Sequence, residues 1–170
     1  MWKVKVPNKV GHFVWRLVRD KLPTGRNLNL RQITVGDLNY ICPLCLRVEE
    51  SVDHLFFSCE RVREIWLECY SWIGFSSGVQ VVPREHFLQH WYCESGRIDG
   101  QRQMVLWAAV TWCIWRHRNK YIFNNQEFRG ETVLDDAMFF IWSWLNALEK
   151  GFNVPFQVWS SNIRMNFVRG

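Results

Sequence analysis

Three cysteines and one histidine occur in a short window with the spacing C-x2-C-x8-H-x4-C, and this spacing restricts the fold more than any other feature of the chain. The four residues are Cys42, Cys45, His54 and Cys59. Two thiols two residues apart can reach one ion from a tight turn, and the intervening Pro43-Leu44 suits such a turn. Because zinc prefers thiolate and imidazole ligands in tetrahedral sites, the window predicts a Zn²⁺ site.

A zinc ion held by four protein side chains has no open position for water or substrate, so the site is predicted to be structural. Ser51 precedes His54 by three residues and is predicted to cap a helical turn that carries the imidazole. Asp53 or a nearby carbonyl is expected to orient that ring. The alternative is that the four residues are unrelated members of the core, since free Cys often behaves as a small buried hydrophobe.

The other cysteines and histidines lack a metal-ligand pattern. We interpret Cys69, Cys93 and Cys113 as buried bystanders, because none has a second thiol at a metal-like spacing. His86 and His90 have the i, i+4 spacing of a metal pair, but no third ligand lies nearby in the sequence.

The composition indicates a folded intracellular protein. The chain has 170 residues, of which 48% are hydrophobic, with 11 Trp and 12 Phe. This is enough for one domain with a real core, and it argues against disorder. Lys and Arg interrupt residues 1–20, so no secretory leader is predicted, and the apolar run 104–115 is too short to span a bilayer. We therefore expect a reduced protein of the nucleus or cytoplasm that is not secreted and has no membrane partner.

Hydrophobic periodicity predicts a mainly α fold: a small helical domain with an embedded CCHC zinc knuckle and a C-terminal helical hairpin. Helices with one apolar face are expected over 8–22, 25–32, 61–73, about 84–93, 101–123 and 132–150. Asn8 and Thr24 are the predicted N-caps of the first two. The short link at 124–126 predicts that the last two helices pack antiparallel.

This pattern suggests a division of the chain into four parts. Residues 1–75 would form the zinc-binding domain, and 76–100 an irregular linker rich in Gly, Ser and Pro. Residues 101–150 would be an aromatic-rich hairpin packed on that domain, followed by a tail over 151–170 with no assigned element.

Positive charge is concentrated before the zinc window. Residues 1–48 contain nine basic and two acidic side chains and have a net charge of +7. The net charge of the whole chain is +5, so the remaining residues are slightly acidic. The residues that we expect to contact phosphates are Lys9, Arg16, Arg19, Lys21, Arg26 and Arg31. A local basic face is typical of a nucleic-acid partner, although an ordinary solvated helix face is the alternative. Tyr40 or Phe57 could stack on bases, with core packing as the alternative for each.

The order of motifs resembles a known family. The N-terminal part contains, in order, Trp2-Lys3, Val6-Pro7-Asn8-Lys9-Val10, Phe13-Val14-Trp15-Arg16, Leu22-Pro23-Thr24, Asn27-Leu28, Arg31, Cys42-Pro43-Leu44-Cys45, Glu50-Ser51, His54-Leu55-Phe56, Cys59 and Trp66. A later run, Trp112-Cys113-Ile114-Trp115-Arg116-His117-Arg118-Asn119, leads to Ile122-Phe123. These residues resemble the zinc-binding domain that follows the reverse transcriptase in non-LTR (LINE-type) retrotransposons, a family abundant in plant genomes. The resemblance covers residues 1–75, and 112–123 more loosely, and implies a module downstream of a polymerase that helps to hold template RNA or target DNA.

No catalytic set accompanies these motifs, so no enzyme activity and no small-molecule substrate are expected. The adjacent Asp135-Asp136 lie in a helical pattern and are interpreted as a solvated helix face. The predicted function is a non-catalytic structural-zinc module, derived from a retrotransposon reverse transcriptase, that binds RNA or single-stranded nucleic acid through its basic N-terminal face. The alternative is a protein-interaction or self-association module, or a decayed retroelement fragment, that uses the Trp-rich helices.

Overall fold

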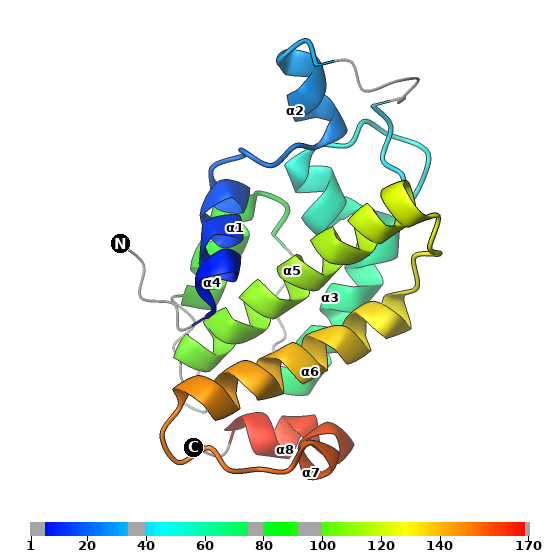
Figure 1. Cartoon of the computed structure of the whole chain (residues 1–170). Coiled ribbons are helices and arrows are strands. Elements are labelled where there is room, and N and C mark those ends of the chain that lie inside the picture. Colours follow the sequence, from blue (N-terminus) through cyan, green and yellow to red (C-terminus); the bar gives the residue numbers. More distant parts are fainter. Residues whose placement is uncertain (1–5, 34–39, 75–79, 92–99, 169–170) are drawn as a thin grey trace.

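The protein is a bundle of helices, as predicted (Figure 1). The computed structural model describes residues 6–33, 40–74, 80–91 and 100–168. Within these residues there is no strand, only an isolated bridge between Ile41 and Glu49. The helices are α1 (Asn8–Val18), α2 (Gly25–Leu30), α3 (Glu60–Ile73), α4 (Pro83–Trp91), α5 (Gly100–Asn124), α6 (Gly130–Leu148), α7 (Phe156–Ser161) and α8 (Ile163–Val168), with a π-turn, η1 (His54–Ser58), before α3. None of these helices has the length and apolar character needed to cross a lipid bilayer.

Helix α5 lies in the middle of the bundle, and most other elements are arranged around it (Figure 1). Helix α6 packs along α5, which confirms the predicted C-terminal hairpin, while α1 and α4 also contact α5 and α3 contacts α6. The sequence predicted one buried face for α5, but its first half is buried on every face, because every side chain from Arg102 to Thr111 is buried. Burial on all sides is typical of a central helix.

Polar contacts join the ends of the hairpin. Arg102 at the start of α5 donates from Nε to Glu149 Oε2, at 3.0 Å, just beyond the end of α6. His117 donates from Nε2 to Asp136 Oδ2, also at 3.0 Å. The interpretation of Asp135-Asp136 as a solvated face therefore holds for the exposed Asp135, whereas Asp136 links the two helices.

Helix α1 ends four residues earlier than predicted, at Val18. Asp20 has a φ of 50°, and the Lys21 N–H donates to the Arg16 carbonyl at 2.7 Å, so the chain leaves the helix through a left-handed residue. The amide of Asn27 fixes this exit by donating to the carbonyl of Asp20, at 3.1 Å, and to that of Leu22, at 3.0 Å.

The two predicted N-caps have different outcomes. Asn8 is the first helical residue of α1, and Pro7 holds the cap position, so the prediction for Asn8 is wrong. The Pro7 carbonyl accepts from the N–H groups of Val10 and Gly11, as the residue before a helix does. Thr24 is the cap residue of α2, as predicted, although its side chain makes no capping hydrogen bond.

Three further helices lie where the sequence pattern was weakest. Helix α4 is close to the expected helix at 84–93, and its side chain Phe87 is buried in the common core. Helices α7 and α8 occupy the part of the chain after 151 for which no element was predicted. Trp159 and Ile163 anchor them in the core, with α7 on α6 and α8 on α3.

A buried hydrogen-bond chain involves His86. The indole N–H of Trp107 donates to His86 Nδ1 at 2.8 Å, and His86 Nε2 lies 3.0 Å from the hydroxyl of Tyr70. Because an indole can only donate, Nδ1 is the acceptor and Nε2 carries the proton. Both ring nitrogens are thus engaged within the core, which removes the support for a His86–His90 metal pair.

The remaining cysteines that the structure describes are bystanders, as predicted. Cys69 and Cys113 are fully buried, and this burial raises the pKa of both thiols. A buried thiol of raised pKa is unreactive at neutral pH. Cys93 lies outside the described residues.

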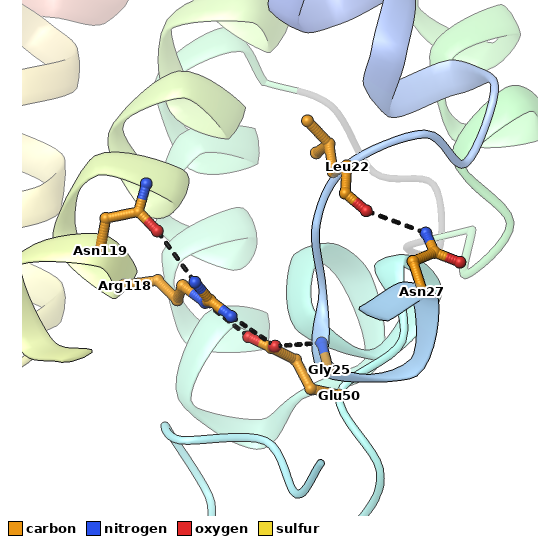
Figure 2. Close-up of polar contacts among 6 residues, drawn as sticks. All are labelled: Leu22, Gly25, Asn27, Glu50, Arg118 and Asn119. Carbon is orange, nitrogen blue, oxygen red and sulfur yellow. Dashed lines mark hydrogen bonds and ion pairs between the residues drawn. The ribbon is translucent and has the colours of Figure 1, made fainter. Parts of the chain in front are cut away.

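A buried ion pair joins the zinc window to the central helix, as Figure 2 shows. Arg118 of α5 donates from Nε and Nη2 to the two carboxylate oxygens of Glu50, each at 2.6 Å. The backbone N–H of Gly25, at the start of α2, donates to the same carboxylate at 2.7 Å. A side chain on Gly25 would meet the backbone of Tyr40 at 3.0 Å, so α2 and the zinc window approach closely here. Glu50 therefore connects three segments that are far apart in the sequence.

Removing the guanidinium should destabilise the protein strongly. In Arg118→Met the Glu50 carboxylate would stay buried without its cation, which costs roughly 3–5 kcal/mol of unfolding free energy. The matched control is Arg47→Met, since Arg47 and Glu60 form an ion pair with side chains 71% and 56% exposed. An exposed pair contributes at most about 1 kcal/mol. Urea unfolding followed by circular dichroism measures both variants, and equal losses of stability would contradict the role assigned to Glu50.

Candidate metal centre

A tight turn presents the first two cysteines on one side of the chain. The Cys42 N–H donates to the Val48 carbonyl at 2.7 Å, and the Leu46 N–H donates to the Cys42 carbonyl at 2.9 Å. Leu46 has a φ of 57°, which closes the turn. The bridge between Ile41 and Glu49 holds the two arms together. We call residues 41–49 the knuckle; it has the turn that the C-x2-C spacing predicts.

The second pair of predicted ligands comes from the π-turn η1. The Ser51 hydroxyl accepts from the His54 N–H at 3.1 Å, which confirms the predicted cap. The His54 carbonyl accepts from the Cys59 N–H at 2.8 Å, so the wide turn brings the first and last residues of this segment together. Leu55 and Phe56 are fully buried and attach the turn to the core. Cys59 then holds the N-cap position of α3.

The structure brings all four predicted ligands together. One donor atom from each of Cys42, Cys45, His54 and Cys59 can be chosen so that all lie within 4.8 Å of one another. A tetrahedral site with Zn–S bonds of about 2.3 Å has an edge of roughly 3.8 Å, so the side chains need only a small inward shift to share one ion. Three thiols and one imidazole form a donor set that suits zinc.

The two ring nitrogens of His54 have different partners. His54 Nε2 lies 3.3 Å from Cys45 Sγ, and Nδ1 lies 3.4 Å from the hydroxyl of Ser58. The polar partner of the second ring nitrogen is thus the Ser58 hydroxyl, whereas Asp53 or a nearby carbonyl was expected in this role. Among the described residues neither has a hydrogen bond to the imidazole. A hydrogen bond at the second nitrogen fixes the tautomer of a metal-ligating histidine.

The protonation of the cluster is consistent with metal binding. The hydrogen bond to Cys59, together with burial, raises the pKa of Cys42, and the same hydrogen bond lowers the pKa of Cys59. Burial lowers the pKa of His54, which favours the neutral ring that a metal requires. Zinc binds cysteine as the thiolate, so metal uptake would release protons.

Comparison with known proteins agrees with this geometry. Residues 1–66 match the family described as zinc-binding in reverse transcriptase. The matched residues, called the zinc-binding segment below, contain all four metal-ligand positions and end within α3. The resemblance seen in the sequence is confirmed over this segment, and the match covers only the zinc-binding domain. No curated protein and no solved structure matches the chain.

The basic residues predicted to contact nucleic acid are all exposed. They lie on α1, on α2 and in the turns that follow these helices: Lys9, Arg16, Arg19, Lys21, Arg26 and Arg31. Two of them contact aromatic rings, since the Lys9 ammonium lies 5.7 Å from the Trp112 ring centre and the Arg19 guanidinium 5.2 Å from that of Trp15. These side chains are accessible to a ligand.

The two aromatic side chains proposed for base stacking differ in exposure. Phe57 is only 1% exposed and packs between Trp66 and Trp107, so the core-packing alternative applies to it. Tyr40 is half-buried beside Gly25. Of the two, Tyr40 alone keeps a surface that a base could reach.

Removal of the metal should separate ligands from bystanders. We expect Cys59→Ser to reduce bound zinc from about one ion per chain to near zero, because a hydroxyl is a poor zinc ligand. An ion present at a thousand times its Kd stabilises the folded state by about 4.1 kcal/mol. For a chain of this size the loss lowers Tm by roughly 8–16 °C. Elemental analysis and thermal unfolding, with and without a chelator, measure the two quantities.

The matched control for this experiment is Cys69→Ser, a change of the same type at a buried thiol outside the cluster. It should retain a full equivalent of zinc and its response to the chelator. A chelated wild-type protein that unfolds at the same temperature as the zinc-loaded form would show that the ion is dispensable.

Proposed function

We propose that this chain is a non-catalytic module, derived from the reverse transcriptase of a LINE-type retrotransposon, that contains structural zinc and binds RNA or single-stranded nucleic acid. The family match of residues 1–66 and the convergence of the four ligands support the origin and the metal. The exposed basic residues of α1 and α2 support the partner.

A structural role for the ion follows from its donor set. Four protein side chains fill a tetrahedral zinc site and leave no position for a reacting water. Cys42 and Cys59 are fully buried and Cys45 and His54 half-buried, so the ion would be covered on the side of the core. In this position zinc fixes the knuckle against the start of α3.

Nucleic-acid binding rests on the charge of the zinc-binding segment. Its first 48 residues have a net charge of +7, whereas the remainder of the chain has −2. Six exposed cations on α1, on α2 and in the turns after them can neutralise phosphates and release counterions, which is the main source of sequence-independent affinity.

The alternative function is a protein-interaction or self-association module that uses the Trp-rich helices. Trp107 and Trp144 of the hairpin are buried, and the large apolar side chains most exposed on α6 are Phe139 and Leu148. On α5, Phe123 is 71% exposed, so the hairpin does offer some apolar surface. We favour nucleic acid as the partner because of the six exposed cations of the N-terminal part. Light scattering after size exclusion measures self-association directly.

Binding should be strongly salt dependent. We expect the wild-type protein to bind single-stranded RNA at about 50 mM salt and to lose most of its affinity for this RNA at about 200 mM salt. The double variant Lys9→Gln/Arg16→Gln should bind more weakly and reduce the slope of log K against log salt by about 2, one for each phosphate contact. Fluorescence anisotropy with a labelled oligonucleotide measures both.

The charge-matched control is Lys150→Gln/Arg164→Gln, which removes two exposed cations from the C-terminal part of the chain. It should leave the salt slope unchanged. If the wild-type protein binds neither RNA nor DNA at the lower salt concentration, the proposed partner is wrong.

A further inference from the structure

A groove with a volume of about 770 Å³ opens between α1, the knuckle and the second half of α5. The buried pair Glu50–Arg118 forms part of its lining, and the other lining residues come from both halves of the chain. A volume of this size lies within the range of small-ligand sites. The groove is separate from the zinc site, although Ile41, Pro43 and Leu46 of the knuckle form part of its wall.

One wall of the groove is cationic. Lys9, His12 and Arg16 line it from α1 with the spacing i, i+3 and i+7, so they share one helix face over roughly 10 Å. Among the described residues that line it, the only carboxylate is that of Glu50, which Arg118 neutralises through two hydrogen bonds. The groove therefore presents net positive charge to a ligand.

The facing wall is aromatic. Trp112, Trp115 and Phe123 line the groove from the second half of α5, over roughly 16 Å, and Tyr40 lines it from the knuckle side. Trp115 is already stacked on Phe56, with ring centres 6.2 Å apart, and the Arg118 guanidinium lies 4.9 Å from its ring centre. The Lys9 ammonium lies 5.7 Å from the Trp112 ring centre, so the two walls meet at that end. Phe123 is 71% exposed at the end of this row, so its ring is available to a ligand.

Cations along one wall and aromatic rings along the other match the chemistry of an unpaired nucleotide. Phosphates pair with Lys and Arg, and bases stack on aromatic side chains with little dependence on sequence. In a duplex the bases are stacked on each other inside the helix and cannot reach such rings. The combination favours single strands over duplexes.

We propose that this groove holds an unpaired segment of RNA or DNA, with phosphates along α1 and bases against the aromatic wall of α5. The inference rests on the proposed function and deepens it, because it names the binding site and the unpaired state of the ligand. It also predicts which aromatic side chain contributes affinity, which the basic surface alone does not.

The variant Phe123→Leu tests the aromatic wall, because it removes the ring and retains an apolar side chain. Its matched control is Phe139→Leu on α6, which is also exposed, at 46%, and does not line the groove. Anisotropy titrations at about 50 mM salt would use labelled oligouridine, oligothymidine and a blunt DNA duplex as probes. We expect Phe123→Leu to weaken binding of both single strands by roughly tenfold and to leave duplex binding within twofold. Phe139→Leu should bind all three probes as the wild type does.

The outcomes distinguish this inference from the proposed function. Wild-type protein that binds single strands, with equal affinities for Phe123→Leu and Phe139→Leu, would overturn the groove and leave the basic face in place. An equal loss of single-strand and duplex binding in Phe123→Leu would also overturn it, since stacking requires unpaired bases. Failure of the wild type to bind any probe would overturn the proposed function itself. Circular dichroism of each variant verifies that it is folded.

Discussion

The fold depends on two short segments that meet at their thiol and imidazole side chains. The knuckle provides Cys42 and Cys45, and the π-turn before α3 provides His54 and Cys59. Neither segment contains a regular helix or strand that would fix it by backbone hydrogen bonding alone. A shared ion would hold them together because metal binding and folding are coupled at such sites. The position of the knuckle then determines one wall of the groove and the environment of Glu50.

Local features of the sequence were sufficient to predict helices α1 to α6 and the metal ligands, but not α7 and α8. Apolar periodicity and the spacing of ligands are local signals that involve residues close together in the sequence. The hairpin of α5 and α6 and the four ligand positions could therefore be predicted. The early end of α1 could not, because it depends on Asp20 in a left-handed conformation and on Asn27, which bonds back to this turn. The burial of Trp159 could not be predicted either, since it depends on how the helices pack together.

Contacts between distant residues were beyond the sequence argument for a physical reason. Glu50 and Arg118 occur in the motifs that resemble the family, but a buried ion pair leaves no periodic signal at either position. The groove could not be predicted from the sequence for the same reason, because it exists only where the cationic face of α1 meets the aromatic face of α5. Charge and aromatic content favour a nucleic-acid partner, which stays a prediction, while the placement of the cations and rings along the groove appears only in three dimensions.

The family match ends at residue 66, yet the groups that complete this segment lie beyond it. The buried stripe of α1, with Phe13 among its members, packs on α5, and the guanidinium that neutralises Glu50 belongs to the same helix. A protein truncated at the border of detectable homology would expose that stripe to water and leave a carboxylate inside without a counter-charge. We expect such a truncation product to aggregate even when it retains its metal. We therefore expect the smallest piece that folds by itself to be longer than the segment that matches the family.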